Sequence, residues 1–138
     1  NTPLIAWWPD KIKPKSFSEF PGHFIDIMPT FVDITGADYP DEFNNQQITP
    51  MQGQSLVPVF NGKNPVRERP IFWEWRRGQA VYNNGFKIVK NGLDNPFDLY
   101  DLNNDPTETT NLADSNPEKR QELETLFENW KKELPTFN

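Results

Sequence analysis

The part of the sequence that most limits the possible folds is residues 71–134, where four short segments rich in aromatic and β-branched residues precede one amphipathic segment. Residues 71–75, 79–82 and 86–90 have the composition of strands, and residues 97–102 alternate apolar with polar side chains. Asn84 and Gly85 lie between the second and third segments, and both residue types tolerate positive φ. The pattern therefore predicts an antiparallel sheet of about four strands with a tight hairpin.

The amphipathic segment, residues 117–134, predicts a long C-terminal helix. Leu123, Phe127 and Trp130 recur at the i, i+4 and i+7 spacing of one helix face. Ser115 or Asn116 can cap its start, where backbone N–H groups have no partner within the helix. A sheet followed by a helix that covers one of its faces defines an α+β fold.

The first half of the chain is less regular. Residues 4–8 (Leu-Ile-Ala-Trp-Trp) form an apolar run typical of a buried strand. We expect this run to be displaced or exposed wherever its partner sheet is missing. Residues 26–36 have helical spacing, with Asp26 as the expected N-cap and Gly36 as the end. The proline-rich stretch 37–70 is predicted to be an ordered loop with short turns.

Composition removes several classes of function. The 138 residues contain no cysteine, which excludes disulfides, cysteine-based metal sites and a thiol nucleophile. Twenty acidic against fourteen basic residues give a net charge of −6, which argues against generic nucleic-acid binding. No apolar run approaches the roughly 20 residues of a membrane span. The start, Asn1-Thr2-Pro3, has neither an initiator methionine nor a signal-peptide pattern, so we expect a piece of a longer chain.

Two candidate sites favour structural explanations. His23 is the only histidine and has no base, nucleophile or second ligand near it in sequence, so a structural or surface role is preferred. Asp101, Asn103 and Asp105 have the spacing that opens a calcium loop, but the sixth position is Pro106 and the twelfth is Leu112. We therefore expect turns in which these side chains accept local backbone N–H groups.

The most informative cluster is residues 73–77, Trp73, Glu74, Trp75, Arg76 and Arg77. On a strand, the two tryptophans share one face while Glu74 and Arg76 share the other. Indole faces can stack on sugar rings, and guanidinium groups bind sulfate, phosphate or carboxylate through paired hydrogen bonds. Alternatively, the tryptophans fill the core and the arginines neutralise nearby acids.

Five blocks together resemble the post-catalytic part of type I, formylglycine-dependent sulfatases, the arylsulfatase family of the alkaline phosphatase superfamily. In order, they are Pro3-Leu4-Ile5-Ala6-Trp7-Trp8-Pro9-x-Lys11-Ile12-Lys13-Pro14, His23-x-x-Asp26-Ile27-x-Pro29-Thr30-x-x-x-Ile34-x-Gly36, Gln52-Gly53-x-Ser55-Leu56, Gln79-Ala80-Val81-x-x-x-Gly85-x-Lys87-Ile88-Val89 and Leu99-Tyr100-Asp101-Leu102-x-x-Asp105-Pro106-x-Glu108-x-x-Asn111-Leu112-Ala113. The resemblance spans nearly the whole chain.

This resemblance implies three parts. The end of the large sulfatase domain comprises residues 1–36, an ordered linking loop comprises residues 37–70, and the C-terminal subdomain comprises residues 71–138. The resemblance also implies that the parent protein hydrolyses sulfate esters of sugars or aryl alcohols with calcium and formylglycine, and is periplasmic or secreted. The Cys/Ser-x-Pro-x-Arg motif that yields formylglycine is absent; Ser115-Asn116-Pro117-Glu118-Lys119 has lysine in place of arginine. We therefore expect this chain to bind no metal, to be inactive alone, and to pack against its own N-terminal catalytic domain.

On this interpretation, residues 73–77 are the candidates for the rim of the substrate pocket. Two alternatives remain. One is a free-standing, non-catalytic carbohydrate-binding or interaction module. The other is a subdomain of a related phosphodiesterase or phosphonate hydrolase, whose closing motif is less similar.

Overall fold

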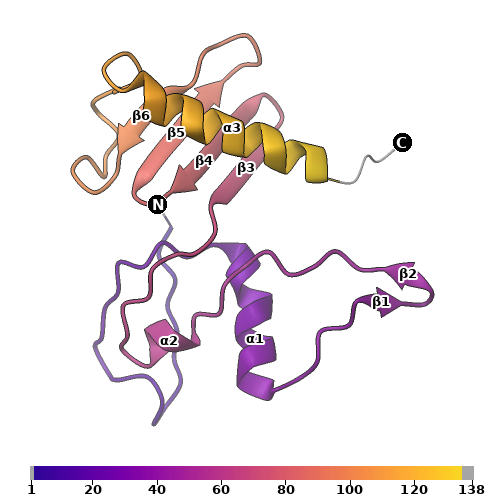
Figure 1. Ribbon diagram of the computed structural model, residues 1–138. Helices are drawn as coiled ribbons and strands as arrows, with labels where there is room; N and C mark the ends of the chain where they lie inside the picture. Colours follow the sequence, from indigo (N-terminus) through magenta and orange to yellow (C-terminus); the bar gives the residue numbers. More distant parts are fainter. Residues whose placement is uncertain (1, 135–138) are drawn as a thin grey trace. The chain divides into compact units, whose positions relative to one another are not determined.

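Residues 70–138 form one of two units of the chain, and their architecture is a sheet with a helix on one face (Figure 1). The computed structural model describes residues 2–134. The sheet is antiparallel in the order β3-β4-β5-β6, and its strands are β3 (Ile71–Trp75), β4 (Gly78–Asn83), β5 (Phe86–Asn91) and β6 (Asp98–Asp101). Helix α3 (Pro117–Glu133) packs on β4 and β5. The predicted α+β class and all four strands are confirmed.

The core of this unit lies between α3 and the sheet. Cross-strand pairing aligns Phe72, Val81, Ile88 and Leu99 across the four strands. Val81, Ile88 and Leu99 are fully buried, as are the predicted helix-face residues Leu123 and Phe127. Burying side chains of this size contributes roughly 1.5–3 kcal/mol each. The apolar period of the helix therefore matches the face that it buries.

The structure confirms the predicted hairpin turn between β4 and β5 and the predicted cap at the start of α3. Asn84 and Gly85 adopt φ of 48° and 83° in the turn between β4 and β5, as a tight hairpin requires. The side chain of Asn116 caps α3 by accepting the N–H of Lys119 at 3.2 Å. Ser115 instead donates its hydroxyl to the carbonyl of Leu112. Of the two predicted caps, Asn116 is the one used.

Residues 1–69 form the other unit, which has few regular elements. They are the 3-10 helix η1 (Phe24–Asp26), helix α1 (Ile27–Thr35), the two-residue strands β1 (Glu42–Phe43) and β2 (Gln46–Gln47), and helix α2 (Val57–Phe60). Gly36 ends α1 in the left-handed conformation, with φ of 64°, as predicted. The loop predicted for residues 37–70 thus contains a small hairpin and one helical turn.

Two expectations for the first unit are wrong. Residues 4–8 form no strand, and no described strand pairs with them; an apolar run becomes a buried strand only when a sheet is present to pair with it. Ile5 and Trp7 in this run are 89% and 87% exposed. Asp26 does not cap α1 with its side chain. His23 caps the preceding η1 turn, and the Asp26 carboxylate is used elsewhere.

Candidate functional site

The predicted rim residues lie where β3 turns into β4. Trp73 and Trp75 are on β3. They share the sheet face opposite α3, since the preceding residue, Phe72, packs against the core beneath the helix and neighbouring strand residues point to opposite faces. Trp75 is 76% exposed and Trp73 is 37% exposed, so neither fills the core. Arg76 is not on the strand. It occupies the two-residue turn with φ of 53°, which corrects the expectation that it shares a strand face with Glu74.

Glu74 projects toward α3, away from the two tryptophans. Its carboxylate accepts hydrogen bonds from Lys131 Nζ at 2.8 Å and from Gln79 Nε2 at 2.9 Å. The bond from Lys131 is the main reason that the pKa of Glu74 is lowered; burial opposes it as the next largest contribution, and the bond from Gln79 adds a smaller lowering. Glu74 is therefore ionised, and its negative charge is balanced by the ammonium group of Lys131 on the helix side of the sheet.

The two arginines remain largely in solvent. Arg76 places its guanidinium carbon 5.8 Å from the ring centroid of Trp75, within the range of a cation–π contact. Arg77 lies 3.6 Å from Asp94, and both side chains are more than two-thirds exposed. An ion pair so exposed contributes little. The structure thus brings together Trp75, Arg76 and Arg77 and separates Glu74 from them.

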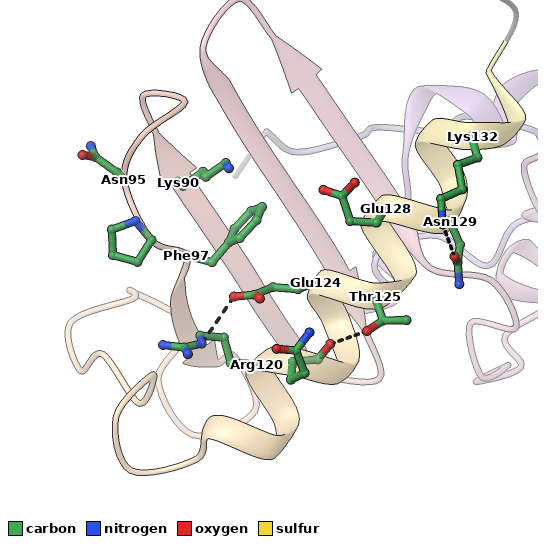
Figure 2. Close-up of a pocket in the computed structure, with 11 residues that line it drawn as sticks. Lys90, Asn95, Phe97, Arg120, Glu124, Thr125, Glu128, Asn129 and Lys132 are labelled. Atoms are coloured by element: carbon green, nitrogen blue, oxygen red, sulfur yellow. Dashed lines mark hydrogen bonds and ion pairs between the residues drawn. The ribbon is translucent and has the colours of Figure 1, made fainter.

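A hollow of about 500 Å³ lies between α3 and the loop that follows β5 (Figure 2). In Figure 2, Arg120 and Glu124 point toward each other, and their Nε and Oε1 atoms are 3.3 Å apart. Thr125 donates its hydroxyl to the backbone of its own helix, and Lys132 donates to Asn129. Sequence spacing gave no signal for this hollow because its walls come from segments more than 20 residues apart. Among the charged residues that line it, Arg120 and Glu124 form an ion pair.

In the first unit, sequence reasoning missed a buried ion pair. The guanidinium of Arg67 binds the Asp26 carboxylate through two contacts, Nη1 to Oδ2 at 2.7 Å and Nη2 to Oδ1 at 3.0 Å, with side chains 4% and 0% exposed. The backbone N–H groups of His23 and Gln54 also donate to this carboxylate. Burial raises the pKa of Asp26, but these hydrogen bonds outweigh it, so the pKa lies below its usual value.

This pair joins three segments that are far apart in sequence. Arg67 also donates to the carbonyl of Pro21 at 3.1 Å, and Thr30 on α1 accepts the N–H of Leu56. Residues 21–26, 54–56 and 67 are thereby held together. Asp26 and Arg67 are 41 positions apart in the sequence, which explains why no local pattern revealed their contact.

The structural interpretation of His23 is supported. Its Nδ1 accepts the N–H of Ile25 at 3.4 Å while the Asp26 carboxylate accepts the N–H of His23, which together form a capping box. Burial is the main cause of a lowered pKa for His23; Arg67 adds to it and Asp26 opposes it. A neutral ring is the form that can accept this hydrogen bond.

Asp101 and Asp105, the candidate calcium ligands, instead accept hydrogen bonds from nearby backbone N–H groups. Asp101 accepts the N–H of Asn103 at 3.1 Å, and Asp105 accepts the N–H groups of Thr109 and Thr110 at 2.7 and 2.8 Å. The bond from Thr110 is the main cause of a lowered pKa for Asp105. The predicted turns are therefore present. Within residues 2–134, no three His, Asp or Glu side chains are grouped so as to hold a metal ion, and no helix is long and apolar enough to cross a membrane.

The chain combines a four-stranded antiparallel sheet and one long helix with a preceding short helix and a small hairpin. The family model described as N-sulphoglucosamine sulphohydrolase, C-terminal, matches residues 1–135. The chain belongs to this family.

Its curated relatives are sulfatases. The chain is 29% identical to an ulvan-active sulfatase of Formosa agariphila over 92% of its own length and 31% of that protein. It is also 29% identical to an N-acetylglucosamine-6-O-sulfatase of Bacteroides thetaiotaomicron over 95% of its length and 25% of that protein. The chain thus spans between a quarter and a third of the length of these relatives.

Solved structures agree with the fold. One is a protein in complex with its substrate D-glucosamine-2-N,6-O-disulfate, with 26% identity and a TM-score of 0.56 over 78% of this chain and 23% of that one. Another, Ps i-CgsB, is in complex with k-i-k-neocarrahexaose, with 25% identity and a TM-score of 0.59 over 76% of this chain and 23% of that one.

Proposed function

We propose that this chain is the C-terminal part of a sulfuric ester hydrolase and that it serves as a scaffold and as the rim of the substrate pocket. The parent protein hydrolyses sulfate esters of sugars or aryl alcohols. The family match over residues 1–135 carries this proposal, and the relatives, three to four times as long, leave room for a separate catalytic part.

The chemistry of sulfate-ester cleavage supports the same division. Charge that develops on the transferring sulfuryl group needs a metal or clustered cations, and the leaving oxygen needs a proton donor. The sequence has no cysteine, and its one histidine caps a helical turn. In our proposal, calcium and formylglycine belong to the preceding part of the parent, which is exported to the periplasm or the cell exterior.

The proposed contact with that catalytic part is the exposed apolar side of α1. Met28 and Phe31 on α1 are 55% and 60% exposed, and Phe24 on the preceding η1 turn, four residues before Met28, is 86% exposed. The residues of α1 that are buried are Pro29 and Thr30 instead. Large side chains gathered on one exposed face are typical of an interaction surface. This face argues against a free-standing module, which would leave it in water.

Two measurements test the proposal. The isolated chain should not hydrolyse an aryl sulfate, with or without calcium, whereas the whole protein should. Metal-dependent turnover by a pure preparation of the chain, or an inactive whole protein lacking the Cys/Ser-x-Pro-x-Arg motif, would contradict it.

A substitution in α1 tests the proposed contact with the catalytic part. Phe31→Ser should lower the melting temperature of the whole protein but leave that of the isolated chain nearly unchanged, because only the whole protein buries this ring. Leu93→Ser, at a side chain that is 55% exposed in the other unit, is the matched control. Equal effects of Phe31→Ser on both proteins would place the interface elsewhere.

A further inference from the structure

The end of β3 carries an indole that its neighbours leave accessible. Trp75 is 76% exposed and pairs across the strand with Gly78, which has no side chain to cover the ring. Trp73 pairs with Ala80, the next smallest residue. These residues line a shallow hollow of about 480 Å³ on the sheet face opposite α3. The face is aromatic and flat rather than enclosed.

The charge beside this face is positive. Arg76 and Arg77 both line the hollow and are exposed. Glu74, the acid between the tryptophans, projects to the other side of the sheet and is neutralised by Lys131. Asp94 contacts Arg77 at 3.6 Å in open solvent, where the attraction is weak. Two guanidinium groups therefore stand beside an exposed indole in a chain whose net charge is −6.

These features complement one kind of ligand. The electron-rich face of an indole attracts the polarised C–H groups of a sugar ring, and guanidinium groups bind sulfate through paired, charge-assisted hydrogen bonds. A small aryl ester needs an enclosing pocket that covers most of its surface. A shallow surface suits an extended ligand that makes several contacts along its length.

We propose that Trp75, Arg76 and Arg77 bind a sulfated oligosaccharide, with a sugar ring stacked on the Trp75 indole and a sulfate ester held by the guanidinium groups of Arg76 and Arg77. The inference deepens the proposed function, on which the choice of sulfate over other anions rests. It places carbohydrate recognition on this chain itself, so the chain without any catalytic part binds the ligand.

The test measures binding of a heparin-derived hexasaccharide to the isolated chain by NMR, with the fully desulfated hexasaccharide as the second probe. The indole N–H signal of Trp75 should shift with the sulfated probe and not with the desulfated one. Arg76→Asn should weaken binding by about tenfold or more, the usual scale for a hydrogen bond to a charged group. Trp75→Ala should weaken binding by roughly three- to tenfold through loss of the stacked ring. Asparagine is chosen because it tolerates the left-handed backbone of residue 76.

Two control variants in the other unit distinguish specific binding at Trp75, Arg76 and Arg77 from general attraction of exposed residues to a polyanion. Trp7→Ala removes an indole that is 87% exposed, and Arg69→Ala removes an exposed guanidinium, both in the other unit. Neither should change the affinity by more than about twofold. Equal losses in Arg69→Ala and Arg76→Asn, an unaffected Trp75→Ala variant that still folds, or no binding at millimolar ligand would each overturn the proposal. Trp75→Phe keeps an aromatic face and should retain part of the affinity if Trp75→Ala fails to fold.

The failure of this site and the failure of the proposed function give different results. Binding that depends on Trp75 and Arg76, together with a whole protein that has no sulfatase activity, would refute the proposed function and leave this site intact. An active whole protein whose C-terminal chain binds no sulfated glycan would refute the site alone.

Discussion

Replacing Arg67 with methionine should destabilise the unit of residues 1–69 by leaving a buried carboxylate without its counter-charge. The Asp26 side chain is 0% exposed, and Arg67 supplies both of its charged contacts. Methionine keeps much of the aliphatic volume of arginine but cannot donate a hydrogen bond. The Asp26 carboxylate would keep only the N–H groups of His23 and Gln54.

The expected magnitude follows from measurements on buried pairs. Removing one partner of such a pair costs about 3–5 kcal/mol, because the other charge stays in a poorly solvated site. Since 1.4 kcal/mol is a factor of ten, this corresponds to a loss of roughly two to three and a half orders of magnitude in an unfolding equilibrium. The loss is limited by the total stability of the unit.

Amide hydrogen exchange is the suitable assay because it reports each unit separately. In Arg67→Met, protection of the N–H groups in α1 and of Leu56 should fall by that factor, while protection in β4 and β5 should not change. Arg69→Met is the matched control. That guanidinium is exposed and donates only to the carbonyl of Met51 at 3.3 Å, so a small effect is expected.

The stability that the Asp26–Arg67 pair contributes should decrease at low pH. The pKa of Asp26 is lowered in the folded chain, so the pair contributes stability above the ordinary aspartate pKa, and this stability is lost as the pH falls through the lowered value. Without Arg67, burial favours the protonated form of Asp26. Acidification should therefore narrow the difference in hydrogen-exchange protection of α1 between Arg67→Met and the wild type. A loss below tenfold in α1, an equal loss in the sheet, or a pH-independent difference would refute the reasoning.

Three further changes test the packing and the turns. Phe127→Ala should lower the free energy of unfolding of residues 70–138 by about 3–5 kcal/mol in urea titrations, since the ring is fully buried; a loss under 1 kcal/mol would contradict the assigned core. Gly85→Ala should cost at least about 1–2 kcal/mol, because the residue has φ of 83° and its Cβ would meet a neighbouring side chain, and it should cost more than Gly62→Ala, where there is open space. Asn116→Ala should lower the stability by about 1 kcal/mol through loss of the helix cap, whereas Ser115→Ala should have a smaller effect in the same titrations.

Local patterns predicted the second unit well because its structure is locally encoded. The period of α3, the Asn84-Gly85 turn and the alternation of β6 each depend on residues within a few positions of one another. The first unit depends on distant contacts instead. Asp26 has the sequence signature of a cap, yet its carboxylate pairs with a residue 41 positions away. No spacing rule predicts such a contact.

The candidate site was predicted in part. A strand explains why Trp73 and Trp75 share a face, and the structure has this arrangement. The predicted strand ends at Trp75 as expected, but the face assigned to Arg76 was wrong because Arg76 lies in the two-residue turn that follows and not on the strand. This turn brings the Arg76 guanidinium back over the Trp75 ring, a contact that depends on backbone geometry rather than on alternation. Whether residues 73–77 contact substrate stays a prediction.

The position of β3 at the edge of the sheet has a consequence for solubility. Beyond β6, the backbone of residues 111–112 covers the other edge through the bond from Leu112 N–H to the Leu99 carbonyl. Among the described strands, β3 pairs only with β4, so one side of an aromatic strand is open to a second molecule. Glu74 lies in the middle of this strand, and charged residues on an open edge oppose edge-to-edge pairing with another sheet. We expect the ion pair of Glu74 with Lys131, which an added strand would partly desolvate, to oppose self-association along this edge.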